Sequence, residues 1–223
     1  MEDFTRYDQK LEFILRTSAR IFAEKGYHST SMRDISRATG VGLAGLYYYC
    51  KSKEELLFLI QDNCFGRVLE RLEQRLGETA DAVERLRLVV ENHLSFFAAN
   101  MAEMKVLSHE AESLAGEMRE RVSGKKQQYT RLVRRILADV QAQQPGERPR
   151  VDLTVATYAL FGMMNWIYNW YDPGGKLSVN DLVDNLTRLF LTGFLAPRAD
   201  EGLQFAPKAA RAERLSVWRA PQG

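Results

Sequence analysis

Three consecutive tyrosines, Tyr47, Tyr48 and Tyr49, are the side chains whose type and spacing most directly suggest contact with another molecule. They lie between a stretch with two glycines, VGLAG, and a basic segment that begins at Lys51. Neighbouring residues of an α-helix point about 100° apart, so three adjacent rings cannot all enter one core. At least one phenol therefore faces outward, where its hydroxyl can donate a hydrogen bond to a partner.

The residue types that serve catalysis or metal binding are scattered along the chain. The histidines are His28, His93 and His109, and the cysteines are Cys50 and Cys64. Their spacing does not match a metal-binding cluster, and the sequence holds no phosphate-binding loop, dinucleotide fingerprint or nucleophile elbow. We therefore predict no enzymatic activity, no metal and no cofactor, and we interpret His93 and His109 as pocket-lining or core polar residues.

Composition and charge indicate an ordinary globular protein with a mildly basic start. The 223 residues are 45% hydrophobic and 27% charged, with a net charge of +2. Residues 1–53 contain nine Lys or Arg and six Asp or Glu, a local charge of +3 that favours an anionic partner there. The sequence shows no secretory signal and no apolar run long enough to cross a membrane, and two lone thiols suit a reducing compartment. We expect a cytoplasmic protein.

Helical periodicity runs through nearly the whole chain, and no stretch keeps the alternation of a β-strand. The first apolar stripe ends at Gly26, while Ser31 with Asp34 and Ser52 with Glu55 have the form of capping boxes. We therefore predict an all-α fold of about nine helices. They are expected at about residues 11–25, 31–38, 43–49, 52–75, 79–100, 103–112, 115–143, 155–170 and 183–196.

The segment SMRDISRATG-VG-LAGLYYY has the layout of a helix-turn-helix, with two short helices joined by a glycine-containing turn. In that motif the second helix enters the DNA major groove and the first crosses the backbone. Ile35, Ala38, Val41 and Leu46 are expected to hold the two helices together. From layout alone, an ordinary helical hairpin is the alternative.

Residues 8–60 resemble the DNA-binding domain of the TetR family of bacterial transcriptional regulators. The resemblance is carried by ILRTSARIFAEKGYHSTSMRDISRATGV and GLYYYCKSKEELL. The positions that match the family pattern are Phe22, Gly26, Tyr27, Thr30, Ser31, Ile35, Ser36, Gly40, Val41, Leu46, Tyr47, Tyr49, Ser52, Lys53 and Leu56. The resemblance implies a DNA-binding domain at residues 1–55 and a ligand-binding and dimerisation domain at 56–196. Because helical periodicity is lost after Pro197, we predict a flexible tail at 197–223.

The resemblance also implies which side chains touch DNA. Tyr47 and Tyr48 are expected to face phosphates, whereas Tyr49 packs inside. The other expected contacts are Thr30, Ser31 and Arg33 at the start of the first short helix, and Lys51 and Lys53 at the start of the following long helix. A solvated helix face is the alternative for Arg33.

The start of the recognition helix departs from the family pattern. Many members carry Ser, Lys or Thr there, but this chain has Gly42, Leu43, Ala44 and Gly45. None of these side chains can hydrogen-bond to a base edge. We expect apolar contact with thymine methyls, close backbone approach and DNA shape to carry more of the specificity.

The last two predicted helices are the expected dimer interface. Their short turn, YDPGGKLS, makes them antiparallel, and the resemblance implies that two such hairpins form a four-helix bundle. Gly162 and Gly193 would allow close approach. A homodimer would read a palindromic operator. The alternative is that both apolar faces are buried within one chain.

A second, narrower resemblance covers LFGMMNWIYNWYDPGGKLSVNDLVDNLTRLFLTGF, which is similar to TetR-family regulators of lipid breakdown that sense acyl-CoA. An apolar pocket would be lined by Phe96, Phe97, Met101, Met104, Met163, Trp166 and Trp170. The phosphates of coenzyme A would meet Arg131, Arg134 and Arg135, together with Lys125 and Lys126. The alternatives are an ordinary helical core and the ordinary polar face of an amphipathic helix.

Together these features predict a repressor that leaves its operator when an apolar effector binds. By the narrower resemblance the effector is an acyl-CoA and the controlled genes serve fatty-acid or lipid degradation. The alternative is a regulator of efflux or stress genes that senses another hydrophobic ligand. A purely structural helical adaptor would lack the salt-sensitive binding to a palindrome that a regulator shows.

Overall fold

The computed structural model describes residues 6–110, 112–143 and 151–195, and within these ranges it contains nine α-helices, one 3-10 helix and no strand. The prediction of an all-α fold is therefore confirmed. The elements are α1 (Arg6–Lys25), α2 (Met32–Thr39), α3 (Leu43–Tyr49), α4 (Lys53–Leu76), α5 (Ala82–Ala98), α6 (Met101–His109), α7 (Gly116–Ala142), α8 (Leu153–Asn165), η1 (Trp166–Asn169) and α9 (Val179–Phe194). No helix in the described ranges is both long and apolar enough to cross a bilayer.

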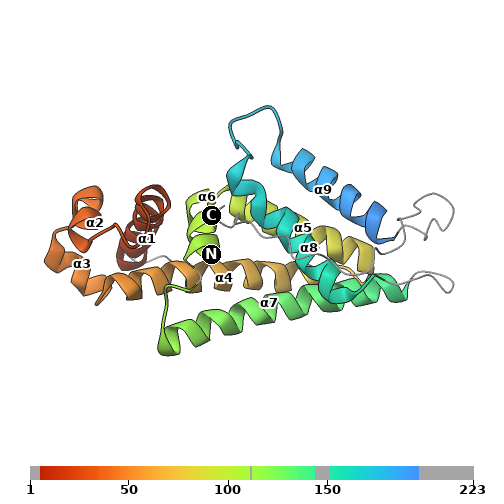
Figure 1. The fold of residues 1–223 in the computed structure, drawn as a ribbon, viewed down its shortest axis with the longest axis horizontal. Coiled ribbons are helices and arrows are strands. Elements are labelled where there is room, and N and C mark those ends of the chain that lie inside the picture. Colours follow the sequence, from red (N-terminus) through yellow and green to blue (C-terminus); the bar gives the residue numbers. More distant parts are fainter. Residues whose placement is uncertain (1–5, 111, 144–150, 196–223) are drawn as a thin grey trace, which may run out of the picture.

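The helices form an elongated molecule with two ends (Figure 1). Helices α1, α2 and α3 gather at one end, while α5, α8 and α9 occupy the other. The two long helices, α4 and α7, pack against each other along the molecule. The short helix α6 lies between the two ends and packs against α1 and α4.

Serine caps determine where several of these helices begin. The Ser31 side chain accepts from the Asp34 backbone N–H, and the Asp34 carboxylate accepts from Ser31 in return, which is the predicted capping box. These bonds lower the pKa of Asp34 to about 2. At α4 the Ser52 hydroxyl accepts from the Glu55 N–H, but the Glu55 carboxylate accepts from the N–H of Lys51. The second capping box was therefore predicted only half correctly.

Two hydrophobic clusters correspond to the two ends. The first joins α1, α2 and α3 to the start of α4, and the second joins the rest of α4 to α5, α7, α8 and α9. Helix α6 contributes to both, because Val106 belongs to the first cluster and Met104 and Leu107 belong to the second. The predicted boundary at residues 55/56 falls in the first turn of α4, which is continuous across it. The predicted flexible tail at 197–223 lies outside the described residues.

The side chains that pack α2 against α3 are those predicted from the sequence, with one exception. Ile35 and Leu46 are both 0% exposed, and Val41 is half-buried. Ala38 is exposed on the outer side of α2, so its prediction as a packing residue was wrong. A Cβ on Gly45 would lie 3.0 Å from Cγ1 of Val41, which explains a glycine inside a helix of seven residues.

Candidate nucleic-acid interface and ligand cavity

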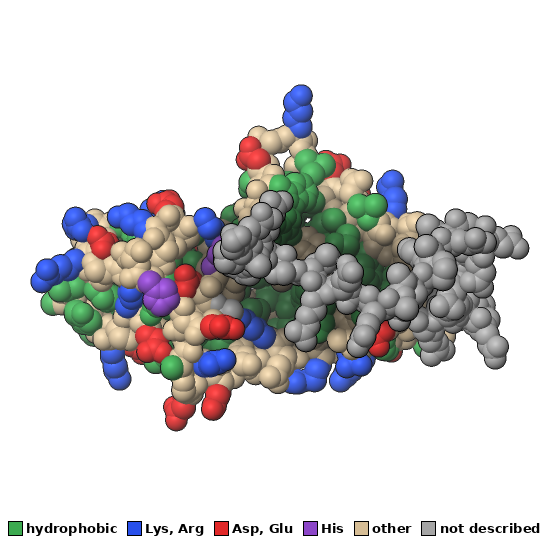
Figure 2. All heavy atoms as spheres, in the orientation of Figure 1, with side chains coloured by type: hydrophobic (Ala, Val, Ile, Leu, Met, Phe, Trp, Pro, Cys, Tyr) green, Lys and Arg blue, Asp and Glu red, His purple; other side chains and the backbone are tan. Residues whose placement is uncertain are grey.

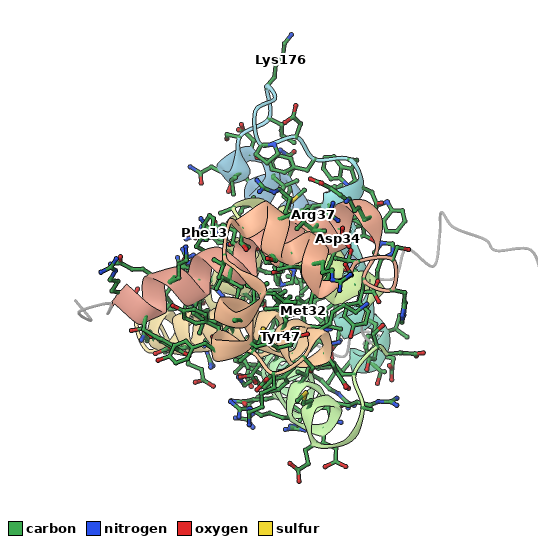
Figure 3. All side chains as sticks on the ribbon, turned by 90° about the vertical axis from the view of Figure 1, so that its left-hand side faces the viewer. Phe13, Met32, Asp34, Arg37, Tyr47 and Lys176 are labelled. Atoms are coloured by element: carbon green, nitrogen blue, oxygen red, sulfur yellow. The ribbon has the colours of Figure 1, made fainter. Side chains whose placement is uncertain are left out.

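The three tyrosines of α3 differ in how exposed they are to solvent. Tyr47 is 47% exposed and Tyr48 is 74% exposed. Tyr49 is half-buried and stacks on Tyr7 of α1, with ring centroids 4.9 Å apart. Figure 3 views this end of the molecule and places Tyr47 and Met32 on its face. The two phenols expected to face phosphates are thus the two most exposed of the three.

The rest of the recognition helix and its neighbours present a mostly exposed surface. Its cap Gly42 and its first two residues are open to solvent, as are Arg33 and Lys51 beside it, whereas Gly45 is half-buried against Val41. Ser31 is exposed as the cap of α2, and Arg37 pairs with Asp34 at 2.5 Å. The predicted contact residues exposed here are Ser31, Arg33, Gly42, Leu43, Ala44, Tyr47, Tyr48 and Lys51.

Thr30 and Lys53 do not lie as predicted. Thr30 is 2% exposed, and its hydroxyl donates to the carbonyl of Gly26 at 2.8 Å. The Lys53 ammonium donates to the carbonyls of Tyr27 and Thr30, at 2.9 and 2.8 Å, and lies 4.4 Å from the centroid of the Tyr27 ring. Both side chains hold the link between α1 and α2, so their polar atoms are directed into the protein.

The start of α1 adds residues to this surface that the sequence reasoning missed. An open groove between α1 and α3 is lined by Arg6, Tyr7, Gln9, Lys10, Phe13, Tyr48 and Tyr49. Lys10 lies over the Phe13 ring at 5.2 Å. Lys and Arg side chains surround a hydrophobic group at this end in Figure 2. The signal in the sequence was the run RYDQK, where basic and aromatic residues recur within one helical turn.

A cavity of about 460 Å³, partly open to solvent, lies in the second cluster between α5, α6, α7 and α8. Aromatic rings dominate its wall, with a few polar groups among them. The lining residues are Phe65, His93, Phe97, Met104, Leu107, Ser108, Lys126, Tyr129, Thr130, Tyr158, Phe161, Gly162, Asn165, Trp166 and Tyr168. A largely apolar cavity with a small number of polar groups is the usual form of a small-molecule site.

The predicted ligand residues divide between this cavity and other places. Phe97, Met104 and Trp166 line it. Phe96 instead lines a smaller cavity of about 210 Å³ between α1, α4, α5 and α6. The predicted residues that do not line the larger cavity are Met101, Met163, Trp170, Arg131, Arg134 and Arg135, and the three arginines are exposed on α7.

The two predicted lysines of α7 also differ from each other. Lys126 lines the cavity, and burial lowers the pKa of its ammonium. Lys125 is bound to Asp62, with its Nζ 2.6 Å from the carboxylate and 2.9 Å from the backbone carbonyl. Arg121 pairs with the same carboxylate at 2.9 Å. Lys125 therefore links α7 to α4, and its ammonium is engaged there rather than free for the predicted contact with the phosphates of coenzyme A.

A hydrogen-bonded pair of buried side chains lies in the cavity wall. His93 of α5 is 2% exposed, and its Nδ1 is 3.1 Å from the hydroxyl of Tyr129 on α7. Burial lowers the pKa of His93 to about 3, against a smaller opposite effect of hydrogen bonding with the Asn165 side chain, so the imidazole is neutral at pH 7. Burial also raises the pKa of the Tyr129 phenol. His93 thus occupies a pocket-lining position, as interpreted from the sequence, while His109 is exposed with its Nε2 3.1 Å from the Tyr168 hydroxyl.

Helices α8 and α9, together with η1 and the residue after it, leave large apolar side chains exposed within this chain. They include Val155, Tyr158, Trp166, Trp170 and Leu189, each at least 52% exposed. Hydrophobic side chains gather around these helices in Figure 2. The stripe predicted to continue as one helix to Trp170 changes at Trp166 into the 3-10 helix η1. The alternative that both apolar faces are buried within one chain does not fit these exposures.

Family models match both parts of the chain. The model described as "Bacterial regulatory proteins, tetR family" matches residues 14–60, and the model described as "Tetracyclin repressor-like, C-terminal domain" matches residues 79–194. The protein belongs to the TetR family. The first match contains the helix-turn-helix and the second contains every helix that lines the cavity except α4.

Similar TetR-family proteins are known from sequence and from structure. The chain is 27% identical to the fatty acid metabolism regulator protein of Bacillus subtilis (strain 168), over 81% of this chain and 93% of that protein. It is 26% identical to the transcriptional repressor KstR2 of Mycobacterium tuberculosis (strain H37Rv), over 81% and 90%. The crystal structure of AibR in complex with isovaleryl coenzyme A and operator DNA is 31% identical, with a TM-score of 0.70, over 81% of this chain and 97% of that one.

These matches decide the class of protein. The relatives are regulators of transcription, and the chain is likewise a TetR-family DNA-binding transcriptional regulator rather than an enzyme. The resemblance found in residues 8–60 is therefore confirmed.

In this TetR-family chain, the cavity and the DNA-binding end are joined through α6 and the segment after it. Met104 and Leu107 of α6 line the cavity, while Val106 packs in the first cluster beside α1. At the end of α6, the Gln61 amide donates to the Glu110 carbonyl at 2.9 Å. Further on, the Ala115 N–H donates to the Glu54 carboxylate at 3.0 Å. A shift of α6 would therefore reach both α1 and the start of α4.

We expect Lys53→Met to destabilise the TetR-type DNA-binding end by about 1–3 kcal/mol, because it removes two charge-assisted hydrogen bonds to backbone carbonyls. Urea unfolding followed by fluorescence measures this free energy. Lys51→Met, at an exposed neighbouring position, is the matched control and should change stability little. Equal stability of the two variants would contradict the structural role of Lys53.

We expect the free energy of unfolding to depend on pH through His93. Below about pH 6.5 the unfolded chain binds a proton at this residue, but the folded chain does not until about pH 3. Stability should therefore fall as pH falls in this window, by up to about 1.4 kcal/mol per pH unit. Urea titrations of wild type and His93→Phe at pH 7, 6 and 5 measure the contribution. Parallel curves for the two proteins would show that His93 is not buried as a neutral group.

Proposed function

We propose that this protein is a homodimeric repressor that binds a palindromic operator and leaves it when an acyl-CoA enters the cavity, and that it controls genes of fatty-acid or lipid degradation. Residues 1–55 would bind DNA, and residues 56–196 would dimerise and hold the ligand. The observation that carries the proposal is the aromatic cavity of about 460 Å³, whose wall includes part of α6. As a regulator of bacterial DNA it would act in the cytoplasm.

The exposed surface of the helix-turn-helix supports the DNA-binding step. Tyr47 and Tyr48 present phenol hydroxyls that can donate to phosphate oxygens. Arg6, Lys10 and Lys51 lie near them and add positive charge. The start of α3 carries no hydrogen-bonding side chain. Sequence specificity would therefore come from apolar contacts of Leu43 and Ala44 with the bases and from recognition of DNA shape.

The apolar face of α8 and α9 supports the homodimer. Large exposed apolar side chains such as Trp166, Trp170 and Leu189 mark an interaction surface. A second copy that presents the same face would cover them by two-fold symmetry and place two recognition helices on two half-sites. Gly162 and Gly193 are both exposed, and a Cβ added at either one would meet no neighbouring side chain of the described residues within 4 Å, which leaves room for this approach.

The effector is inferred from the cavity together with the relatives. Its aromatic wall suits an acyl chain, and Met104 can adapt to the shape of that chain. The AibR structure contains isovaleryl coenzyme A and operator DNA, and the Bacillus subtilis relative is a fatty acid metabolism regulator. On this chain Lys126 at the cavity and Arg131, Arg134 and Arg135 on α7 are the basic groups that could meet the phosphates of coenzyme A.

Release would follow from a shift between two conformations. A ligand that fills the cavity contacts Met104 and Leu107, and displacement of α6 moves α1 because the two helices pack together. The spacing of the two recognition helices would then no longer match one operator. The ligand drives this shift only by as much as it binds the released conformation better.

The deciding experiment measures binding of the full-length protein to an operator fragment by fluorescence anisotropy, with acyl-CoA thioesters of several chain lengths as titrants. Free coenzyme A and free fatty acids are the controls. We expect release by a thioester and by neither of its parts. Firm operator binding that no thioester relieves would refute the acyl-CoA effector and leave another hydrophobic ligand as the candidate.

A further inference from the structure

One buried polar atom in the cavity wall makes no hydrogen bond of good geometry within the described part of the chain, although the Asn165 side chain, which also lines the cavity, lies near the same ring. The atom is Nε2 of His93, whose other ring nitrogen is 3.1 Å from the Tyr129 hydroxyl. The histidine is 2% exposed and the tyrosine is 3% exposed, and both line the cavity. Unpaired buried polar atoms are rare because they lose their bonds to water and gain nothing in return. The position of this atom in a ligand cavity therefore points to a ligand group that completes its bonding.

The bond between His93 and Tyr129 determines what that group must be. If the phenol donates to Nδ1, then Nε2 carries the ring proton and is a free donor. If Nδ1 donates to the phenol oxygen, then the phenol hydrogen is the free donor and Nε2 is a free acceptor. In both arrangements the pair keeps one N–H or O–H hydrogen that the His93–Tyr129 bond does not use. The cavity therefore offers a hydrogen bond to an acceptor atom of the ligand.

The surroundings of the pair determine the charge of that acceptor. The imidazole lies among the rings of Phe97 and Phe161, with centroids 4.7 and 6.2 Å away. Burial lowers the pKa of His93 to about 3, so the ring provides no positive charge at pH 7. A carboxylate that entered this apolar site would lose its hydration without gaining an ion pair from His93. An uncharged carbonyl oxygen fits the pair better.

We propose that His93 and Tyr129 bind the thioester carbonyl oxygen of the acyl-CoA, and that they select acyl thioesters over chains of equal length without that carbonyl. This assignment rests on the proposed function. The cation that lines the same cavity is Lys126, whose ammonium lies 5.4 Å from the Phe65 ring centroid. Recognition of a free fatty acid would have to use that lysine, so a free acid forms a separate arm of the test.

The test compares three ligands of equal chain length by isothermal titration calorimetry with the full-length protein. They are an acyl-CoA, the corresponding S-alkyl-CoA thioether, which lacks only the carbonyl oxygen, and the free fatty acid. We expect the acyl-CoA to bind about 10-fold more tightly than the thioether. The thioether displaces water from the cavity but offers no oxygen to accept the hydrogen bond from His93 or Tyr129. We expect the free acid to bind more weakly still.

Two substitutions at one position assign this preference to the pair. His93→Phe removes both ring nitrogens and suits an aromatic cluster, so we expect acyl-CoA and thioether to bind with equal affinity. His93→Gln keeps a neutral donor and an acceptor for the Tyr129 hydroxyl, so we expect it to retain most of the preference. Operator binding without ligand shows that each variant is folded. If His93→Phe does not fold, Tyr129→Phe takes its place, with a reduced preference expected.

The outcomes separate this inference from the proposed function. A preference for the acyl-CoA that is lost in His93→Phe and kept in His93→Gln supports the carbonyl site. Equal affinity of wild type for acyl-CoA and thioether, or a preference unchanged in His93→Phe, overturns the carbonyl site alone. Failure of both CoA derivatives to bind overturns the acyl-CoA effector and the carbonyl site together.

Discussion

Leu189→Asp is expected to convert the protein from a dimer to a monomer and to abolish tight operator binding. Leu189 is 66% exposed on α9, one of the two helices expected to form the dimer interface. In a two-fold dimer, one substitution places two carboxylates in the interface, and an unpaired buried charge costs about 3–5 kcal/mol. We therefore expect the dimer dissociation constant to rise at least about 100-fold. Analytical ultracentrifugation measures the dissociation constant, and anisotropy with a full palindrome measures the operator affinity.

A matched substitution separates loss of the interface from a general effect of charge. Gln127→Asp adds the same carboxylate on an exposed side of α7 that is lined by other residues of α7, and should leave both dimerisation and operator binding intact. A Leu189→Asp protein that remains a dimer at micromolar concentration would show that this face is not the interface. The exposed Trp166 and Trp170 would then need another partner.

Removal of the two exposed phenol hydroxyls is expected to weaken operator binding about 100-fold. Each hydrogen bond from a phenol to a phosphate at this solvent-exposed surface contributes about 0.5–1.5 kcal/mol, and the double variant Tyr47→Phe/Tyr48→Phe removes two of them from each protomer. Because a dimer carries the change twice, the losses add to about 2–6 kcal/mol per operator. Anisotropy titration with the operator at several salt concentrations measures the change.

Two control variants identify the kind of contact. Tyr49→Phe alters a half-buried ring stacked on Tyr7 and should bind the operator nearly as wild type does. Lys51→Ala removes a charge and should reduce the slope of log affinity against log salt, by about 2 per dimer, whereas the tyrosine variants should keep that slope. A loss for Tyr49→Phe as large as that of the double variant would contradict the assignment of the DNA contact to Tyr47 and Tyr48.

Local patterns explain why most of the helices could be predicted from the sequence. The bounds of α3 at Leu43–Tyr49 matched the prediction, because glycines before it and a serine cap after it act within a few residues. The 3.6-residue period required at least one of the three rings to face outward, and the family resemblance separated the exposed Tyr47 and Tyr48 from the half-buried Tyr49. The break of α8 into a 3-10 helix at Trp166 was missed, since hydrophobic spacing alone does not distinguish the two kinds of helix.

The errors at the candidate sites have one physical origin. Thr30 and Lys53 have the residue types and positions of DNA contacts, yet their polar atoms bind carbonyls that the chain folds toward them, in the case of Lys53 from residues 23 and 26 positions away. Lys125 likewise has the type of a phosphate ligand but pairs with Asp62, 63 residues away. Residue type shows which bonds a side chain can make, whereas long-range packing selects the partner.

The sequence by itself determined the helical class, the helix-turn-helix and the family of this protein. These properties follow from periodicity, caps and a motif that each lie within a few dozen neighbouring residues. Only the tertiary structure decided the cavity, its pairing of His93 with Tyr129 and the exposure of α8 and α9. His93 and Tyr129 are 36 residues apart on different helices, and no local pattern encodes their meeting or the unpaired nitrogen that results. Such features depend on how helices from distant parts of the chain pack together, and this packing determines which ligand the cavity can hold.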